Sequence, residues 1–435
     1  MKPIEVKKAL KRSIHEISRI SWLYSVRPGK DNTRTRKLPF EKNINAVLAF
    51  RGGTLNKEIR EFFGVGKSMP TASAFIQQRS TILPEAFNAL FHMFTDSINT
   101  QFDLNAMRIF AVDGTVLESA GYPDDPDSYF APKDGKKPYN LHHINAMYDL
   151  ENHIFMDALI QGVHEENEQV ALVRMVDRSH IRNALVIADR GYESYNCLAH
   201  IQEKGWFFLF RIRNTMGIAS GLSLPQQVSF DVPFSLNLTR CQSAYTRSLD
   251  RNQCKILKDK RFDFLPVSLK TCPDDVFYNL PFRIVRFPIS DSVSETIITN
   301  LDPVRFPLLE IKRLYALRWG VETAFREIKY TIGLRSLHAK KVELVLQEIF
   351  AKLIMFNFCQ AITLSVILQQ KHRKLSYSIA FADAAHICLQ FFLQNLSPPY
   401  LEGLLARFIV PVRPSRNIPR KLRHVCSVPF SYRLA

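Results

Sequence analysis

The sequence predicts an α/β fold: a mixed sheet flanked by helices, with a helical segment before the sheet and a strand-rich segment inserted into it. An apolar, strand-like run at residues 109–117 follows the helical segment. Residues 165–179 have helical spacing and separate that run from a second buried strand at 184–188. Helical patterning returns from residue 308 onward, after a long stretch of alternating strand runs. Alternation of this kind predicts a sheet with helices packed on its faces.

The composition indicates a globular protein that binds a polyanion. The 435-residue chain is too long for one ordinary domain, and its 46% hydrophobic and 23% charged residues argue against disorder and against a membrane protein. Lys and Arg outnumber Asp and Glu by 58 to 41, which gives a net charge of +17. Such a surplus is typical of proteins that bind nucleic acid; a solubility role or a membrane-surface patch is the alternative.

The two ends of the chain are its most basic segments. Residues 1–42 hold twelve Lys or Arg against four acids, and residues 411–435 hold six against none. Because basic ends usually contact phosphates, we expect a basic N-terminal arm at 1–42 and a basic tail on a helical C-terminal region at 341–435. The N-terminus lacks the apolar core of a secretory signal, and the seven cysteines show no CxxC or metal-ligand spacing. Both patterns favour a cytoplasmic protein with reduced cysteines.

Residues 43–100 predict a helical DNA-binding domain. Glycine-rich breaks divide this segment into short helices, and residues 54–63 and 70–79 flank one such break. The pair fits a helix-turn-helix whose second helix would enter a groove, with Arg79 among its polar side chains. A plain helical bundle fits the same pattern equally well.

The first part of the sheet is expected at residues 101–205. Residues 145–150 and 153–160 form a hairpin after the first apolar run, and a helix then leads into the second buried strand. This order of strand, hairpin, helix and strand is that of ribonuclease-H-like nucleases, and other mixed α/β folds share it. Residues 206–305 predict a β-rich insertion, and residues 306–340 return to the sheet with a helix.

The most informative pattern lies on that returning helix. Tyr315, Arg318, Glu322 and Lys329 stand at offsets of zero, three, seven and fourteen. On one continuous helix these offsets place the four side chains within about 60° of one another. One carboxylate among cations and a phenol suits a site that holds a divalent metal against a phosphodiester. Glu327 points to another side of the helix and is the poorer candidate for the acid.

Two aspartates in strand-like surroundings are the other candidates. Asp113 lies inside an apolar run, where a buried carboxylate needs a compensating cation or metal. Asp189 directly follows the second buried strand, and ligands bind at such strand ends in open α/β sheets. Taken singly, each aspartate fits a turn-capping role equally well. Together with Glu322 they could converge on one sheet edge and hold two Mg²⁺ ions about 4 Å apart.

These motifs resemble those of a known family. The four helix residues with their gaps are similar to the YREK signature of DDE transposases encoded by bacterial insertion sequences: Tyr315-x2-Arg318-x3-Glu322-x6-Lys329. The surroundings of the two aspartates resemble the first and second aspartate motifs of that family: Val112-Asp113-Gly114-Thr115 and Ile187-Ala188-Asp189-Arg190-Gly191-Tyr192. The likeness runs through the chain and includes a β-rich insertion between the second aspartate and the glutamate.

The resemblance implies a ribonuclease-H-like catalytic domain and roles for its residues. The ligands of two Mg²⁺ ions, or of Mn²⁺ as an alternative, would be Asp113, Asp189 and Glu322. The side chains that contact the phosphates of the transposon end would be Tyr315, Arg318 and Lys329. Arg326 lies near the same face, where a phosphate contact and a pair with Glu322 are equally good interpretations.

The implied function is DNA transposition. The protein would bind the terminal inverted repeats of its element, cleave the ends by two-metal hydrolysis and join them to target DNA. Double-stranded DNA would be its partner, with a dimer bridging both ends in a synaptic complex, and the protein would be nucleoid-associated in a bacterial cytoplasm. The alternatives are a related metal-dependent nuclease that does not join DNA and a DNA-binding protein without catalysis.

Other tempting residues are weaker candidates. His142 and His143 are adjacent on a strand and therefore point to opposite faces, which argues against a shared metal. Glu168, on the first turn of a helix, fits a supporting group beside the site. Trp206 and Trp319 fit the core better than a platform on which a base stacks.

Overall fold

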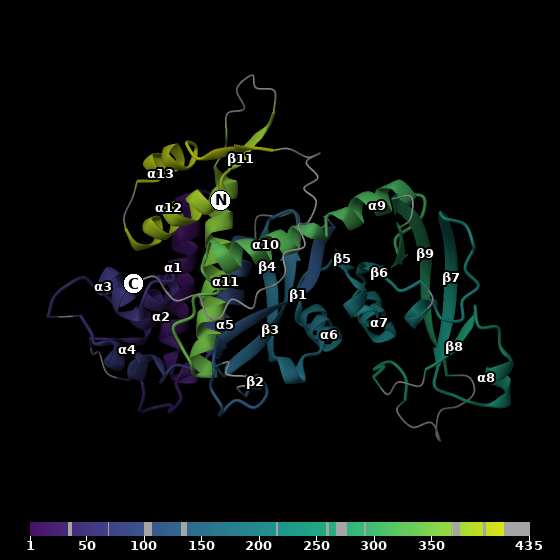
Figure 1. Ribbon diagram of the computed structural model, residues 1–435, viewed down its shortest axis with the longest axis horizontal. Helices are drawn as coiled ribbons and strands as arrows, with labels where there is room; N and C mark the ends of the chain where they lie inside the picture. The colour runs from purple at the N-terminus through teal and green to yellow at the C-terminus, as the bar shows by residue number, and fades with distance from the viewer. Residues whose placement is uncertain are drawn as a thin grey trace.

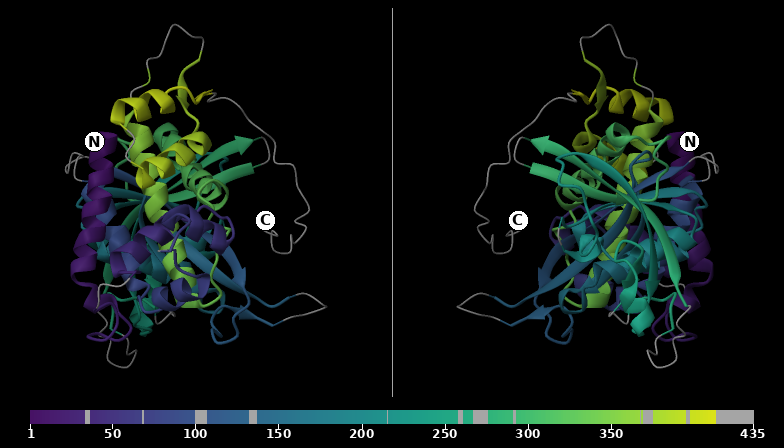
Figure 2. Two further views of the ribbon diagram at one scale, coloured as in Figure 1. Left: turned by 90° about the vertical axis from the view of Figure 1, so that its left-hand side faces the viewer. Right: turned by 90° about the vertical axis from the view of Figure 1, so that its right-hand side faces the viewer.

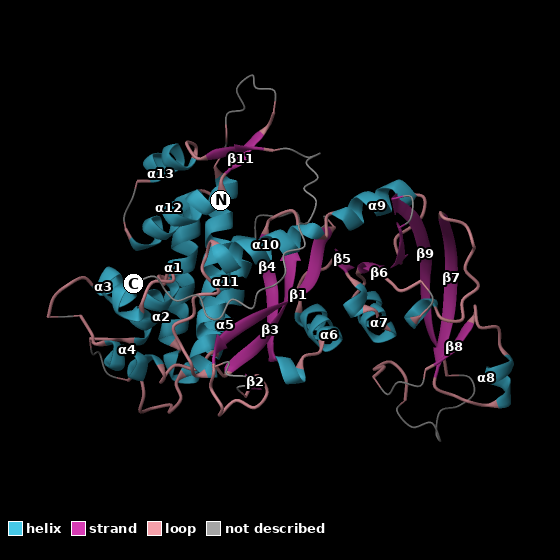
Figure 3. Ribbon diagram, in the orientation of Figure 1, coloured by secondary structure: helices cyan, strands magenta, loops and turns pink. Residues whose placement is uncertain are grey.

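A computed structural model gives the structure of the chain. It describes residues 1–412 except 34–36, 68, 100–106, 132–136, 215, 258–260, 267–275, 291–292, 367, 369–374 and 395–396. The predicted basic tail beyond residue 412 lies outside the described residues. A helical body lies at one end of the molecule, and a long sheet runs from it to the other end (Figure 1). Figure 3 shows the same division, with most helices gathered at the end opposite the outermost strands.

The helical body is built from both ends of the chain. Its N-terminal part consists of α1 (Pro3–Arg19), a 3₁₀ turn at Ser21–Tyr24, α2 (Phe40–Leu48), α3 (Leu55–Phe63), α4 (Ala72–Arg79) and α5 (Glu85–Asn99). Its C-terminal part consists of α11 (Val342–Ser365), α12 (Phe381–Leu393), α13 (Pro398–Leu405) and a small sheet of β11 (Tyr377–Ile379) and β12 (Ile409–Pro411). The helices α1, α2 and α5 pack on α11, which runs through the middle of the body.

The N-terminal segment differs from the basic arm that we expected. Its first helix, α1, buries Leu10, Ile14 and Ile17 at helical spacing and packs on α5 and α11. Lys7 Nζ donates at 2.6 Å to a carbonyl near the end of α12. Over α1 the segment is therefore a packed helix, because its apolar face decides its position more strongly than its charge does.

The two helices predicted as a helix-turn-helix are present as α3 and α4. Thr54 and Thr71 cap them, and their side chains accept from backbone N–H groups in the first turns. Arg79, expected among the groove-reading side chains of the second helix, is instead buried, and its Nη1 lies 2.8 Å from Glu348 Oε1 on α11. This arginine holds α4 to the body and is not available to DNA.

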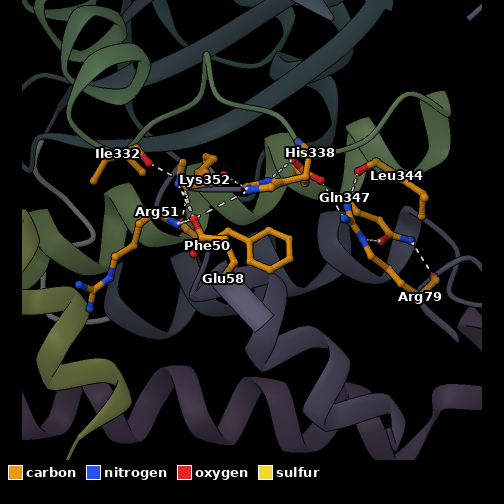
Figure 4. A network of polar contacts seen from close by, with 12 residues as sticks. Phe50, Arg51, Glu58, Arg79, Ile332, His338, Leu344, Gln347 and Lys352 are labelled. Atoms are coloured by element: carbon orange, nitrogen blue, oxygen red, sulfur yellow. Dashed lines mark hydrogen bonds and ion pairs between the residues drawn. The ribbon is translucent and has the colours of Figure 1, made fainter. Parts of the chain in front are cut away.

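A buried polar network continues from this ion pair to the segment that follows α10 (Trp319–Tyr330; Figure 4). Glu348 Oε2 accepts from the backbone N–H of His338 at 2.7 Å. Lys352 Nζ donates to the carbonyls of Phe50 and Ile332 at 2.5 and 2.9 Å. Buried charges are stable only when they are compensated in this way. The network therefore fixes the segment after α10 against the N-terminal helices.

The strands form one continuous mixed sheet in the order β2-β3-β1-β5-β6-β10-β9-β7-β8, with β4 also paired to β3. Their bounds are β1 Arg108–Ala120, β2 Tyr129–Phe130, β3 Tyr139–Asp149, β4 Ile154–Gly162, β5 Ala184–Ala188, β6 Phe207–Arg211, β7 Phe230–Thr239, β8 Cys254–Ile256, β9 Tyr278–Ser290 and β10 Val293–Thr299. Strand β3 is antiparallel to its neighbours β1 and β4, whereas β1, β5 and β6 are parallel. The prediction of a mixed sheet is confirmed.

Helices cover both faces of the central strands. On one face, α6 (Glu168–Arg178) and α7 (Tyr195–Glu203) pack on residues such as Phe110 and Val112 of β1. On the other face, Ala111 joins a core with α10 (Trp319–Tyr330) and α11, while α9 (Leu308–Ala316) packs on β5 residues such as Ile187. Successive strand residues thus point to opposite cores, as the pleat requires. The end views show the ribbon around β2 and the start of β3 projecting sideways from the lower part of the molecule (Figure 2).

The predicted β-rich insertion continues the central sheet. Strand β6, with which we began the insertion, pairs in parallel with β5, and β10, β9, β7 and β8 follow outward from it. Short helical turns occur between these strands at Arg190–Tyr192, Gly217–Ala219 and Ala244–Ser248, and a further 3₁₀ turn lies at Val163–Glu165. Edge pairing with β6 explains this arrangement, because an unpaired strand edge readily accepts another strand.

The long helix α11 is buried on almost all sides. Its polar residues have partners within the protein; for example, Asn357 Oδ1 accepts from the backbone N–H of Phe155 at 2.8 Å. Among the described residues, no helix is both long and apolar enough to cross a membrane. Among the described residues, buried free thiols lie at 197, 254, 359 and 388, and Cys241 is buried as well; Cys272 and Cys426 lie outside the described residues.

Candidate active site

The register of the sheet brings two of the predicted acids together. Asp113 follows Val112 on β1, and Asp189 follows Ala188 at the end of β5. Val112 and Ala188 are partners on these two parallel strands. The aspartates therefore stand side by side at the carboxyl end of β5, where ligand sites form in open sheets.

The third acid, Glu322, reaches the same place from α10, which packs on β1. Arg318 connects the acids: its Nη2 lies 2.9 Å from Glu322 Oε1, and its Nη1 lies 3.5 Å from Asp113 Oδ2. The Arg318 side chain is only 5% exposed. Asp113, Glu322 and, through its charge, Asp189 thus surround one buried guanidinium.

The single helix that we predicted for the four signature residues is interrupted. Tyr315 lies near the end of α9, and α10 begins after Arg318. Between them the backbone N–H of Arg318 donates to Tyr315 O at 3.1 Å, which is the spacing of a tight 3₁₀ turn. Gly320 packs closely on Leu150, whose Cδ2 would lie 2.6 Å from a Cβ at that position. The prediction of a continuous helix is wrong at this turn, although Tyr315, Arg318 and Glu322 still face one site.

The last cation of the signature, Lys329, and the nearby Arg326 differ in their surroundings. Lys329 Nζ donates to Thr115 Oγ1 at 2.6 Å and to Val116 O at 3.0 Å, so this lysine lies beside the second half of β1. Arg326 is exposed one turn earlier on α10. Burial raises the pKa of Glu327 to about 7 although Arg326 opposes this, and Glu327 Oε2 accepts from Gln360 on α11 at 3.3 Å. Glu327 therefore faces away from the acids, as predicted.

Sequence reasoning missed a second arginine of the site, Arg211 at the end of β6. Its Nε lies 2.7 Å from Asp189 Oδ1 and its Nη2 lies 2.9 Å from Asp189 Oδ2. Its Nη1 lies 3.4 Å from Glu295 Oε1 on β10. The signal in the sequence was a charged residue that ends the apolar run of β6. The role of Arg211 depends on the pairing of β6 with β5 and β10, which the sequence alone does not show.

The pKa values of the two aspartates are shifted in opposite directions: that of Asp113 is raised and that of Asp189 is lowered. Burial raises the pKa of Asp113 to about 6, although Arg318 and the backbone N–H of Gly114 oppose this rise. Burial also acts to raise the pKa of Asp189, but the backbone N–H of Arg190 and the Arg211 guanidinium outweigh it and hold the pKa below its ordinary value. Burial raises the pKa of the Tyr315 phenol as well, with the Asp189 charge as the next cause. The phenol therefore stays protonated and able to donate.

Glu168 lies between the two segments that carry the aspartates. A Cβ at Gly191 would collide with Glu168 Oε2, and one at Gly114 would collide with His143 and lie 3.0 Å from Glu168 Oε1. His143 Nε2 lies 3.8 Å from Glu168 Oε1. Burial and the charges of Asp113, Glu166 and Asp189 all raise the pKa of Glu168. The residue that we expected beside the site thus contacts both glycines directly.

Of the weaker candidates, the two histidines and Trp206 lie as predicted, and Trp319 does not. His142 and His143 point to opposite faces as predicted, since His142 Nε2 bonds Ser119 Oγ at 3.0 Å on the other side of the strand. Trp206 is buried in the core, as expected. Trp319 is 53% exposed next to Arg318, whose guanidinium lies 4.8 Å from the centre of its ring. The expectation that Trp319 belongs to the core is wrong, because the turn before α10 rotates it to the surface.

The donor atoms fit a divalent metal ion that prefers oxygen ligands. Three carboxylates from two strands and a helix are the hard donors that Mg²⁺ selects. Two buried polar atoms, Tyr315 Oη and Arg318 Nε, have no hydrogen-bond partner within the described structure, and such orphans indicate room for a bound group. With the side chains as they lie, no cluster of three or more His, Cys, Asp or Glu among the described residues is arranged to hold a metal. Arg318 lies between Asp113 and Glu322, and Arg211 contacts both oxygens of Asp189.

Comparisons with known proteins agree with these motifs. Residues 105–358, more than half of the chain, match the family model described as transposase DDE domain. The transposase InsG for insertion sequence element IS4 of Escherichia coli strain K12 is 27% identical over 154 residues, which cover 32% of this chain and 34% of that protein. The chain thus spans about a third of the length of the curated relative that it matches. A cryo-EM structure of a piggyBac transposase synaptic complex with hairpin DNA has 10% identity and a TM-score of 0.45, covering 95% of this chain and 84% of that chain.

Proposed function

We propose that this chain, which belongs to the transposase DDE domain family, is the transposase of a bacterial insertion sequence. It would bind the terminal inverted repeats of its element, cleave the DNA at those ends and join the ends to target DNA. Because both ends must be cut together, a dimer would bridge them. The protein would work in the cytoplasm, associated with the nucleoid.

The observation that best supports this proposal is that three acids converge near the carboxyl end of the central strand β5. Asp113 and Asp189 are adjacent through the register of β1 and β5, and Arg318 joins Glu322 to Asp113. We assign these acids as the ligands of two Mg²⁺ ions, with Mn²⁺ as an alternative. When bound, the ions would supply activation of the attacking water or 3′-hydroxyl and neutralise charge on the leaving oxygen. One site could then serve both hydrolysis and joining.

The cations beside the acids would position the DNA strand. Arg318 would give up its contacts with Asp113 and Glu322 to a phosphate, which a guanidinium can bind through two parallel hydrogen bonds. The unpartnered Tyr315 hydroxyl would donate to the same phosphodiester. Lys329 and the exposed Arg326 would contact neighbouring phosphates along α10. These contacts would hold the scissile bond in line with the attacking oxygen, which is the main contribution a protein makes to phosphoryl transfer.

A cleavage assay with purified full-length protein tests the proposal. The substrate is a duplex that carries the terminal repeat of the element, with Mg²⁺ and a supercoiled target plasmid. We expect nicks at the element end and joined products from the wild type, and neither product from Asp189→Asn with DNA binding retained. Equal nicking by wild type and variant would overturn the assignment of Asp189. Nicks without joined products would instead indicate a nuclease, and binding without nicks a DNA-binding protein.

A further inference from the structure

Both oxygens of Asp189 are engaged by one arginine. Arg211 contacts Oδ1 through Nε and Oδ2 through Nη2, a bidentate arrangement at 2.7 and 2.9 Å. Asp189 Oδ1 also accepts the backbone N–H of Arg190 at 2.6 Å. A metal ion needs a lone pair on at least one of these oxygens, and it is repelled by the guanidinium charge.

Arg211 has a second acidic partner within reach. Glu295 lies on β10, next to β6 in the sheet, and its Oε1 is 3.4 Å from Arg211 Nη1. This contact uses one guanidinium nitrogen, whereas Asp189 uses the other two. The Glu295 side chain is 16% exposed, and burial raises the pKa of its carboxyl, with Arg211 and Arg318 opposing the rise. A short rotation of the guanidinium would therefore exchange one half-buried carboxylate for another.

Arg318 holds the other two acids in a similar way. It lies between Asp113 and Glu322, and its Nε has no partner among the described atoms. Two guanidinium groups thus neutralise much of the negative charge that three close carboxylates would otherwise share. Without them the acids would repel one another, since like charges within a few ångström destabilise the ionised state.

We propose that Arg211 is a counter-ion that holds Asp189 in the metal-free protein, and that metal loading moves Arg211 from Asp189 to Glu295. This inference rests on the proposed function, because it takes Asp189 as a metal ligand. Arg211 is then a positioning residue: it keeps the second aspartate ready and competes with the metal for its oxygens. Glu295 receives the guanidinium when the metal takes its place. The exchange would keep the acids assembled and still delay metal binding.

Mn²⁺ binding to the full-length protein without DNA, measured by isothermal titration calorimetry, tests this exchange. Arg211→Gln should bind Mn²⁺ about tenfold more tightly than the wild type, by analogy with the effect of removing a charge at this distance. Glu295→Gln should bind Mn²⁺ more weakly, because Arg211 loses its second partner and stays on Asp189. Arg213→Gln is the matched control, since Arg213 is exposed two residues further along and its removal takes away the same charge; its affinity should match the wild type within about twofold.

The outcomes separate this inference from the proposed function. Unchanged or weaker Mn²⁺ binding by Arg211→Gln, with an unchanged melting temperature, would overturn the competition between Arg211 and metal. Arg211→Lys provides a second measurement if the glutamine variant fails to fold, because lysine keeps the charge but cannot hold both oxygens; its Mn²⁺ affinity should also rise, and an unchanged affinity would count against the exchange. Equal Mn²⁺ binding by wild type and Asp189→Asn would instead remove Asp189 from the metal site and defeat the proposed function itself.

Discussion

At the scale of single residues, the site depends on two glycines that leave room for an acid. Glu168 Oε2 occupies the space that a Cβ at Gly191 would take. We expect Gly191→Ala to lower the stability of the protein by about 1 kcal/mol, the low end of the cost of overpacking, because the end of the Glu168 side chain can shift. Urea unfolding of the metal-free protein measures this loss. Gly403→Ala is the control, because a Cβ at position 403 meets no atom within 4 Å.

A double variant tests the cause of that loss. Glu168→Ala removes the carboxylate that the new methyl group would strike, so Gly191→Ala should cost much less stability in the Glu168→Ala background. The coupling between the two changes should be about 0.5–1 kcal/mol, as for residues in direct contact. Additive effects would mean that Gly191 is needed for its backbone and not for the space beside it.

The Tyr315 hydroxyl gives a prediction with two separate readouts. It is buried and has no hydrogen-bond partner among the described atoms, so Tyr315→Phe should leave the stability of the free protein unchanged or raise it by up to about 1 kcal/mol. If the hydroxyl donates to a phosphate, the same variant should bind the element end more weakly in a filter-binding assay. A clear loss of stability without DNA would show that the hydroxyl already has a structural partner.

The residues that could be predicted from the sequence are those whose role can be recognised from their neighbours along the chain. Asp113 and Asp189 were identifiable because a carboxylate within or directly after an apolar strand is unusual wherever that strand lies. Arg211 and Glu295 were not, because their role depends on β6 lying between β5 and β10. That order is set by pairing between distant segments, and an apolar run in the sequence does not show which other strand it will pair with.

At the scale of elements, tertiary packing overrode a helical pattern. The offsets of the signature residues fit one helix, yet the chain forms two, with a tight turn between α9 and α10. The turn lies where Gly320 packs on Leu150, a contact between segments far apart in the sequence. Helical periodicity shows which side chains share a face, but it carries no information about such a contact, and propensity is a weak guide against it.

The network that fixes the segment after α10 predicts a dependence of stability on pH. Burial acts to raise the pKa of Glu348, but Arg79 and His338 outweigh it and lower the pKa from its ordinary 4.5 to about 2. A carboxyl whose pKa falls on folding stabilises the protein above its unfolded pKa, and this contribution is lost as the pH drops toward the folded pKa. Glu348→Gln should therefore cost about 3 kcal/mol at pH 7, and much less near pH 2.

Urea unfolding of wild type and Glu348→Gln at pH 7, 4.5 and 3 measures this difference. The gap between the two proteins should be largest at pH 7 and should narrow steadily below pH 4.5. Glu343→Gln on the exposed side of the same helix controls for the loss of one acid and should show a small, constant gap. A gap for Glu348→Gln that stays constant down to pH 3 would contradict the lowered pKa.

At the scale of the whole molecule, apolar faces and strand edges decide the architecture, and charge decides what the surface can bind. The basic N-terminal segment contains the packed helix α1, because that helix carries an apolar face. The β-rich segment extends the sheet, because β6 offers a free edge. The alternating pattern in the sequence indicates the strands of the β-rich segment, but it does not indicate that they extend the central sheet, and we did not predict the helix α1. The net charge of +17 therefore predicts a polyanionic partner without predicting which segment contacts it.

Salt dependence can assign that contact to α10. If Lys329 and Arg318 contact phosphates of the element end, each contact releases a counter-ion from the DNA on binding. Each then adds about one to the slope of log Kd against log salt concentration. Lys329→Ala and Arg318→Ala should each weaken binding and lower the salt slope by about one. Lys341→Ala is the control, because Lys341 is exposed after α10 and should leave the slope unchanged if the DNA follows α10 itself. A slope that falls for Lys341 and not for Lys329 would place the DNA on the helical body, away from the three acids.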